Sequence, residues 1–321
     1  MKKLKRSKSI NKCVLSLLIL ILFLLITDTY RTKTYGDYEL YLCDSVIPNN
    51  KSNILQKNCP RRPIVTVEQL GRLGNHMWLY ASVWAVAKET GRDPYVPGCI
   101  IKVLEEVFDN LLIPSLAQIS HCPVTKYATT PSIELWNVSK DDILLPQYAQ
   151  LPEFVVPRLD EVIMLFKFKK HLLEESQRFL MRYSIWKENT IFVGVHVRRT
   201  DYIKVLPVVW NKEVVKPIYF LTIMEYFEVK YSTVMFIVVS DDPDWCKRNL
   251  QAKKYNVAVV KNSLAGQDLA ILAACNHSII DYGTFGMWGA MLAGGETYLY
   301  NISWGLEITM SHLMTNWHVV N

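Results

Sequence analysis

Several large classes of protein are excluded by what the sequence lacks. Its 321 residues contain no internal repeat and no low-complexity segment, which argues against a repeat array or a fibrous chain. The cysteines follow none of the spacings of zinc sites. Six of the 36 basic residues lie in the first 12 positions, and the rest of the chain balances 30 basic residues against 30 acidic ones. The folded part therefore has no general basic surface for a nucleic acid.

The first 27 residues differ from everything that follows. Cations crowd residues 1–12, a run of Leu, Ile, Val and Phe spans residues 13–27, and no acidic residue precedes Asp28. No small-x-small cleavage site follows the run, so we expect an uncleaved signal-anchor rather than a removed signal peptide. The positive-inside rule then makes 1–12 a cytoplasmic tail, 13–27 a transmembrane helix and the remainder lumenal. The polar composition of residues 28–62 predicts a stem.

A lumenal location permits disulfides and glycans. Six cysteines lie beyond the anchor and allow up to three bridges in any of fifteen pairings, with Cys275 an alternative buried thiol because its surroundings are apolar. Three Asn-x-Ser triplets are candidate glycosylation sites, at Asn137, Asn276 and Asn301. Asn276 is the weakest of the three, since it lies in a segment expected to pack.

Apolar runs alternate with helical patterns, which predicts an α/β fold with parallel, doubly wound sheets. The expected strands are Ile64–Val67, Ile191–Val197, Val234–Val239, Val257–Val260 and Ser278–Tyr282. Helices are expected up to Ala87, over Ile218–Lys230, from Asp268 and from Met287, with an extended loop over Asp201–Pro217. We predict an N-terminal α/β domain at 63–185 and a C-terminal Rossmann-like domain at 186–321.

The strand Ile191–Val197 runs directly into a charged stretch that contains His196, Arg198, Arg199 and Asp201. Ligands bind at the carboxyl ends of strands in open α/β sheets, and the planar fork of Arg grips phosphate. The stretch therefore predicts a phosphate-bearing ligand. The structural alternative is an ion pair between Arg199 and Asp201, with Arg198 in solvent.

Two glycine turns precede expected helices. Gly71-Arg-Leu-Gly-Asn75 follows the first strand, and Gly283-Thr-Phe-Gly286 follows the last. A strand, a glycine turn and a helix start bring backbone N–H groups to a phosphate or a sugar, although such turns also serve as tight connections. The first turn lacks the Gly-Lys-Ser/Thr end of a nucleotide-binding P-loop.

The stretch Asp242-Pro-Asp244 has the form of an Asp-x-Asp metal motif. Hard divalent cations favour such carboxylates. Asp-Pro after a strand is also an ordinary turn and helix N-cap. We expect no metal, because the arginines already neutralise a diphosphate.

Three stretches together carry a family resemblance. His196 to Asp201 resembles the His-x-Arg-Arg-x-Asp motif shared by α1,2-, α1,6- and protein O-fucosyltransferases. Gly71-Arg-Leu-Gly-Asn-His-Met77 is similar to the opening of the galactoside α1,2-fucosyltransferases (glycosyltransferase family 11), and Asp268 to Ser278 with Gly283 to Trp288 is similar to their C-terminal signature. The resemblance covers roughly residues 63 to 305 and implies a GT-B-like fold, with two Rossmann-like domains around a donor-binding cleft.

The resemblance implies an inverting enzyme that moves L-fucose from GDP-β-L-fucose to the 2-hydroxyl of a galactose-terminated glycan, without a metal or other cofactor. It gives Arg198 the catalytic role at the β-phosphate, with Asp201 a weak candidate for general base. It assigns the donor to Arg72, Asn75, His196, Arg198, Arg199, Asp268, Thr284, Phe285 and Gly286. His76 stands where the family usually has Gln, so a contact made by that amide is not carried over.

The same resemblance implies a single-pass type II protein of the Golgi membrane with a lumenal catalytic domain, and it leaves room for a homodimer. Two other readings stay open. Thr200 stands where α1,2-type members usually have Gly and is shared with the α1,6 type, which keeps a core-glycan or protein acceptor in view. A catalytically silent, membrane-anchored glycan-binding protein could keep the same fold.

Overall fold

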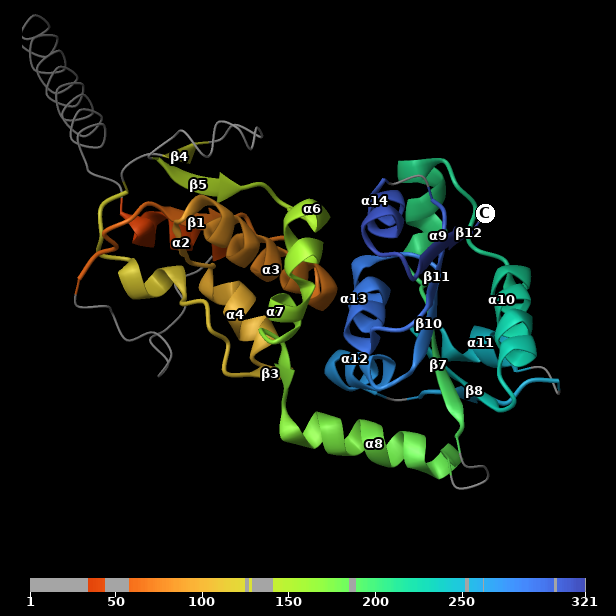
Figure 1. Ribbon diagram of the computed structural model, residues 1–321. Helices are drawn as coiled ribbons and strands as arrows, with labels where there is room; N and C mark the ends of the chain where they lie inside the picture. The colour runs from red at the N-terminus through yellow and green to blue at the C-terminus, as the bar shows by residue number, and fades with distance from the viewer. Residues whose placement is uncertain are drawn as a thin grey trace, which may run out of the picture.

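The structure, a computed structural model, describes residues 34–43, 58–124, 127–128, 141–184, 189–251, 254–261, 263–302 and 305–320. Two parallel β-sheets form two lobes that lie side by side (Figure 1). The predicted anchor at 13–27 and Asn137 fall outside the described residues. Within those residues, no helix combines the length and the apolar character needed to cross a bilayer.

The N-terminal lobe is built on a four-stranded parallel sheet in the order β2-β1-β5-β4. Its strands are β1 (Ile64–Val67), β2 (Asp93–Pro94), β4 (Tyr127–Ala128) and β5 (Asp142–Leu145), and β3 (Phe108–Asp109) pairs antiparallel with β6 (Lys167–Phe168). Its helices are α2 (Tyr35–Cys43), α3 (Leu73–Thr90), α4 (Gly98–Leu104), η1 (Leu116–Ile119), α6 (Pro152–Val155), η2 (Val156–Arg158) and α7 (Leu159–Ile163). Every residue of β1 is buried, as its apolar, β-branched sequence predicts.

The C-terminal lobe is built on a six-stranded parallel sheet in the order β12-β11-β10-β7-β8-β9. Its strands are β7 (Ile191–Val197), β8 (Val234–Ser240), β9 (Val257–Val259), β10 (His277–Ile280), β11 (Thr297–Tyr300) and β12 (Trp317–Val320). The helices are α8 (Lys170–Ser184), α9 (Tyr202–Val205), η3 (Leu206–Trp210), α10 (Pro217–Lys230), α11 (Pro243–Leu250), α12 (Ala265–Ala273), α13 (Thr284–Ala293) and α14 (Leu306–Leu313).

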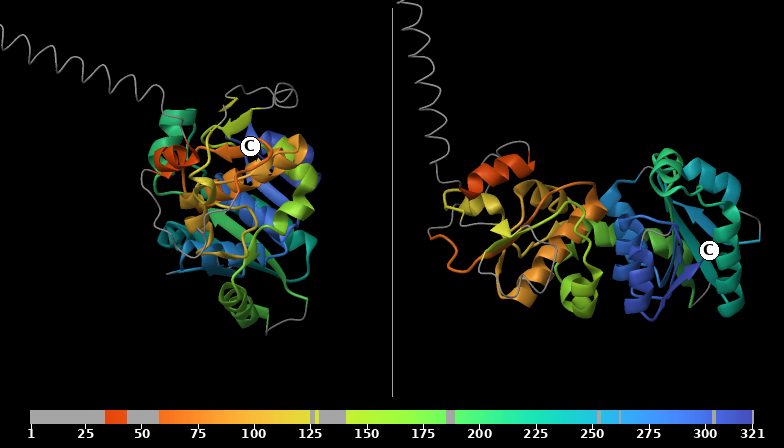
Figure 2. Two further views of the ribbon diagram at one scale, coloured as in Figure 1. Left: turned by 90° about the vertical axis from the view of Figure 1, so that its left-hand side faces the viewer. Right: turned by 90° about the horizontal axis from the view of Figure 1, so that it is seen from above.

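Helices α12, α13 and α14 cover the face of this sheet that is turned toward the N-terminal lobe, and α10 and α11 cover the opposite face (Figures 1 and 2). The lobes meet where α3 packs on α13: the buried rings of Trp78 and Trp288 lie 5.3 Å apart between centroids. Helix α8 connects the lobes and packs on α12. Because α3 follows β1 and α13 follows β10, the contact brings two strand ends together.

The expected extended loop over Asp201–Pro217 is wrong, since its first half is helical as α9 and η3. The carbonyl of Asp201 accepts the N–H groups of Lys204 and Val205, each at 3.0 Å. Leu206 is fully buried and fixes the segment in the core. Pro207 is the second residue of η3.

Part of the predicted stem is folded onto the N-terminal lobe. Tyr35 and Leu42, seven residues apart on one face of α2, are buried, and the Tyr35 hydroxyl donates to Asp142 at 2.7 Å. Disulfides Cys43–Cys99 and Cys59–Cys122 fasten this region. The remaining two cysteines beyond the anchor, Cys246 and Cys275, are buried free thiols, so two of the three permitted bridges form. The composition of residues 28–62 is polar on average, so it does not predict that a few of these side chains are buried.

Glu39 of α2 is buried, and its Oε1 accepts the N–H of Gly98 at 2.7 Å. Burial raises the pKa of Glu39 from its ordinary 4.5 to about 7, although the Gly98 hydrogen bond opposes the shift. A carboxyl whose pKa is raised in the folded state contributes most stability below its unfolded pKa and loses it as pH rises through the folded value.

We therefore expect Glu39→Gln, which mimics the protonated form, to raise the free energy of unfolding by up to about 3 kcal/mol at pH 8 and by little near pH 4.5. Denaturant unfolding at the two pH values measures the difference. Exposed Glu106→Gln on the same lobe is the control. An equal effect of Glu39→Gln at both pH values would contradict the assignment.

Candidate functional site at the lobe junction

Carboxylates from both neighbouring strands hold the end of β7. Asp281, which follows β10 and is 1% exposed, accepts the backbone N–H of Arg198 at 2.6 Å. Asp241, which follows β8, accepts the N–H groups of Arg199 at 2.8 Å and Thr200 at 3.2 Å. The turn after β7 is thus fixed from two sides, because β10 and β8 flank β7 in the sheet.

The guanidinium of Arg198 is held edge-on by two carboxylates. Its Nη2 lies 2.7 Å from Oδ2 of Asp201, and its Nη1 lies 2.9 Å from Oδ2 of Asp241. A guanidinium has five N–H donors in a fixed fork, so these contacts set its plane and leave other donors for an anion. The side chain is 20% exposed.

Asp201 also reaches the other lobe. Nη2 of Arg72, at the start of α3, lies 3.4 Å from its Oδ2, so one carboxylate lies between guanidiniums from the two lobes. Partial burial alone would raise the pKa of Asp201, but its hydrogen bond to Arg198 and the charges of Arg198 and Arg72 hold that pKa below its ordinary value. The alternative considered from the sequence, an ion pair between Arg199 and Asp201, does not form; Asp201 pairs with Arg198 and Arg199 pairs with Asp242.

Arg199 is directed toward α11, where its guanidinium lies 3.9 Å from the ring centroid of Trp245 and Nε lies 3.5 Å from Oδ2 of Asp242. Asp242 also caps α11 by accepting the N–H of Trp245 at 3.1 Å. Asp244 is exposed and pairs with Lys261 at 3.1 Å. The two carboxylates of the Asp-x-Asp stretch therefore have separate protein partners.

Among the described residues, the cluster of metal-ligating types that the structure assembles is Cys59, His121 and Cys122. Its two cysteines are joined in a disulfide and so offer no thiolate.

His196 lies in a tight niche beside the β7 end. Its Nδ1 is 3.3 Å from Oδ1 of Asp281, and its ring centroid is 5.6 Å from that of Phe285. A Cβ on Gly286 would come within 2.7 Å of the same Nδ1, which explains the glycine. Asp268 accepts the hydroxyl of Ser263; burial raises the pKa of Asp268, while this hydrogen bond and the charge of His196 oppose the shift.

The two glycine turns meet at the junction. Oδ1 of Asn75 accepts the hydroxyl of Thr284 at 2.9 Å and Nε2 of Gln150 at 3.3 Å. A Cβ on Gly74 would lie 2.6 Å from the backbone N of Phe285, so the helix starts approach to a distance that only glycine allows. Neither α3 nor α13 has a side-chain cap, so the first N–H groups of these two neighbouring helix starts have no side-chain acceptor; free N–H groups at a helix start suit an anion.

Of the predicted donor residues, Arg72, Asn75, Arg198, Thr284 and Phe285 meet at the lobe junction, and His196 and Gly286 lie beside Phe285. Arg199 is directed to α11 instead, and Asp268 accepts the hydroxyl of Ser263.

Sequence reasoning missed Asp241, Asp281 and Gln150. Asp241 and Asp281 each follow a buried strand, and that position was the available signal. Gln150 follows β5 in a segment without any motif. Thr200 was the residue that left a core-glycan or protein acceptor open. Its hydroxyl donates to Asp241 at 2.5 Å, so this side chain helps to hold the turn after β7.

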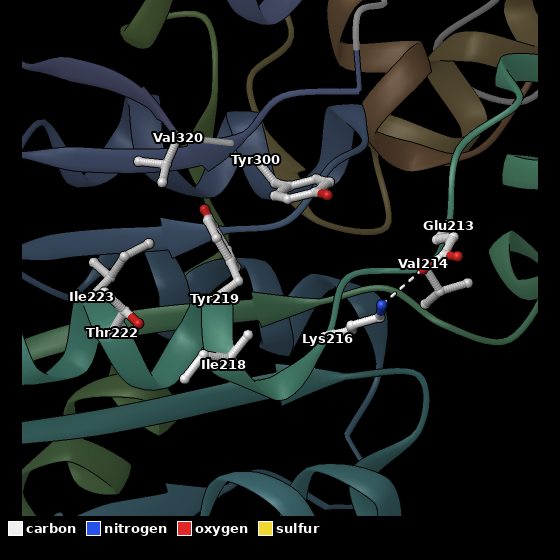
Figure 3. A pocket seen from close by; sticks show the side chains of 9 residues that line it. All are labelled: Glu213, Val214, Lys216, Ile218, Tyr219, Thr222, Ile223, Tyr300 and Val320. Carbon is white, nitrogen blue, oxygen red and sulfur yellow. Dashed lines mark ion pairs between the residues drawn. The ribbon is translucent and has the colours of Figure 1, made fainter.

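A pocket of about 310 Å³ opens elsewhere, between α10 and the ends of β11 and β12 (Figure 3). Tyr219, Tyr300 and the ion pair of Glu213 with Lys216 form part of its wall. None of the predicted site residues lines it.

Two of the predicted glycosylation sites fall within the described residues. Asn276 is exposed, but its Oδ1 accepts the backbone N–H of Phe192 at 2.9 Å. Asn301 is half-buried after β11, where its backbone N–H donates to the carbonyl of Val320 at 2.9 Å.

A family model described as Glycosyl transferase family 11 matches residues 41–318. The chain is 33% identical over 265 residues to galactoside 2-alpha-L-fucosyltransferase Sec1 of Mus musculus. The match covers 77% of this chain and 69% of that protein. It is 36% identical over 257 residues to galactoside alpha-(1,2)-fucosyltransferase 2 of Bos taurus, and that match covers 74% of this chain and 71% of the relative.

The fold is similar to that of a crystal structure of the α1,6-fucosyltransferase NodZ soaked with GDP-fucose. The TM-score is 0.50 at 13% identity, and the match covers 75% of this chain and 96% of that one. At this identity the likeness concerns the α/β fold with its parallel sheets alone.

Asp281 and Asp241 together form a clamp on the end of β7. This clamp predicts that two nearby aspartates, Asp241 and Asp244, differ in how much they stabilise the fold. Asp241→Ala removes the acceptor of two backbone N–H groups and a partner of Arg198, and we expect the free energy of unfolding to fall by about 2–4 kcal/mol. Asp244→Ala removes an exposed ion pair in the same loop and should stay within about 0.5 kcal/mol of the unmodified protein. Denaturant titration compares them, and equal losses would argue against the clamp.

Proposed function

The chain belongs to glycosyl transferase family 11, and on this premise we propose that its lobe junction transfers L-fucose from GDP-β-L-fucose to the 2-hydroxyl of a galactoside. The activity is that of a galactoside 2-alpha-L-fucosyltransferase, as in the relatives that are 30–36% identical over most of the chain. The two parallel sheets fit a GT-B-like arrangement in which the C-terminal lobe holds the nucleotide.

One observation carries the assignment of the donor site: the carboxylate of Asp201 lies between Arg72 and Arg198, each from a different lobe. An anion of the chain thus occupies the position that a diphosphate would take between two guanidinium forks. The uncapped starts of α3 and α13 add backbone N–H groups at the same place.

The chemistry follows from charge. When the galactose hydroxyl attacks the anomeric carbon of fucose from the face opposite GDP, negative charge builds on the β-phosphate. Arg198 is our choice for the cation that stabilises it, because Asp241 and the β7 clamp fix its guanidinium before any substrate arrives. Such preorganised donors usually make the largest single contribution to the rate.

The nucleoside lies deeper, against His196, Phe285 and Gly286. The niche around the imidazole is closed on one side by Asp281 and bounded by the Phe285 ring. The carboxyl of Asp268 accepts a hydrogen bond from the guanine edge. Thr284 contributes its backbone to the phosphates while its hydroxyl stays on Asn75.

Asp201 makes a poor general base in this arrangement. Its two arginine partners lower its pKa, and a weakly basic carboxylate takes a proton less readily. We assign it to holding Arg198 and Arg72 in place while no nucleotide is bound. An oxocarbenium-like transition state demands little deprotonation of the incoming hydroxyl.

We place the enzyme in the Golgi membrane, with residues 13–27 as its anchor and the catalytic lobes in the lumen. The basic residues before the apolar run support this orientation. Two disulfides in the N-terminal lobe support an oxidising compartment.

The proposal predicts transfer of radiolabelled fucose from GDP-fucose to a terminal β-galactoside by the full chain in detergent. Arg198→Ala should lower kcat by about two to three orders of magnitude, because it removes the cation aimed at the leaving phosphate. Arg178→Ala, which truncates an exposed arginine of α8, should change nothing. An Arg198→Ala enzyme that turns over like the unmodified one would refute this role.

We also expect transfer to continue in EDTA at a rate within about twofold of the untreated rate, because fixed cations take the place of a metal at the diphosphate. Initial rates with EDTA, and with manganese added back, test this. Activity that disappears in EDTA, returns with manganese and is lost in Asp244→Asn would establish a metal at the Asp242-Pro-Asp244 turn instead.

A further inference from the structure

The turn after β5 holds an aromatic side chain in a costly backbone conformation. Tyr148 has φ of 56°, in the left-handed region that side chains with a Cβ rarely adopt, and it is 49% exposed. Strain of this kind persists where surrounding contacts impose it, and it gathers at functional sites.

The neighbours of Tyr148 impose its conformation. Ser82, buried in α3, donates its hydroxyl to the carbonyl of Ala149 at 2.7 Å and accepts the N–H of Leu151 at 3.3 Å. The N–H of Gln150 donates to the carbonyl of Tyr148 at 2.6 Å, and the Gln150 side chain reaches Asn75. These contacts fix the backbone, whereas no described residue hydrogen-bonds to the phenol of Tyr148.

The turn that carries Tyr148 lies at the edge of the N-terminal sheet from which the Gly71 turn also leaves. Strands β1 and β5 are parallel neighbours, and the N–H of Glu68 still bonds to the carbonyl of Leu145 at 2.9 Å beyond the β1 end. The Gly71 turn with Arg72 and the Tyr148 turn therefore leave the same edge of the N-terminal sheet.

Tyr202 marks the other side of the junction. Burial raises its pKa, Arg198 opposes the shift, and nearby acidic groups, Tyr148 among them, add to it. The ring of Tyr202 lies 5.7 Å from the guanidinium of Arg198, on the C-terminal side of the junction.

We propose that Tyr148 binds the acceptor, with its ring face against the galactose and its phenol hydroxyl within reach of a sugar hydroxyl. The inference rests on the proposed function and assigns a residue to its second substrate. The donor groups belong mainly to the C-terminal lobe and the two helix starts, so the acceptor must enter from the remaining side. Tyrosine suits a sugar, because it joins an apolar face to a polar tip and loses little conformational freedom when it binds.

The test separates the effect of the Tyr148 ring on acceptor binding from the effect of its backbone strain on stability. Tyr148→Gly removes the ring and relieves the left-handed conformation, so the variant should melt at or above the temperature of the unmodified enzyme. Its KM for a β-galactoside acceptor should rise by about 3- to 10-fold, the scale of one lost aromatic contact. Its KM for GDP-fucose and its acceptor-independent hydrolysis of GDP-fucose should stay unchanged.

Two variants complete the comparison on the full chain. Tyr148→Phe keeps the ring and should shift the acceptor KM less than Tyr148→Gly does. Asn110→Gly relieves a left-handed residue with the same φ of 56° elsewhere in the N-terminal lobe and should leave both KM values unchanged. If Tyr148→Gly melts at a lower temperature than the unmodified enzyme, the KM values for acceptor and donor are measured on Tyr148→Ala instead.

An acceptor KM that is unchanged in Tyr148→Gly and Tyr148→Ala overturns the assignment. A parallel rise in the donor KM also overturns it, because the turn would then act through Asn75. Failure of the unmodified enzyme to transfer fucose to any β-galactoside would instead refute the proposed function.

Discussion

The site depends on one arrangement, in which two aspartates from flanking strands accept the backbone amides at the end of β7. A strand that ends inside a sheet leaves N–H groups that must find acceptors. Asp281 and Asp241 supply them, and each also contacts a side chain of the same motif, His196 or Arg198. Position and charge are thereby set together: the carboxylates that fix the backbone also orient the imidazole and the guanidinium.

The second constraint is the close approach of two helix starts. Gly74 and Phe285 lie too near for any side chain on the glycine, and Trp78 packs on Trp288 one turn further along. Stretches more than two hundred residues apart in sequence are held in contact by apolar packing, while Asn75 and Thr284 join them through a hydrogen bond. The lobe junction is therefore a packed interface with polar groups at its rim, which suits a site that must place two substrates against each other.

The parts of the fold that the sequence predicts are those with a strong local cause. Apolar, β-branched runs identify β1 and β7 with their observed limits. Strands of a parallel sheet are covered on both faces, so their sequences are continuously apolar and do not alternate with polar residues. The residues after β7 were misjudged, since buried Leu206 outweighs the loop-like composition around it. Asp241 and Asp281 act from strands that neighbour β7 in the sheet but not in the chain, so no local spacing could reveal their partners. The folded part of the predicted stem likewise depends on distant partners, through the buried side chains of Tyr35 and Leu42 and the disulfide Cys43–Cys99.

The position of Asp201 has a consequence for turnover. A carboxylate that belongs to the chain competes for Arg72 and Arg198 at a constant effective concentration, however much nucleotide the solution contains. Under the proposed function it weakens the hold on incoming donor and on spent GDP alike. Product release limits kcat in many enzymes, so an internal carboxylate that takes the place of the departing nucleotide between Arg72 and Arg198 shortens the time each nucleotide stays bound.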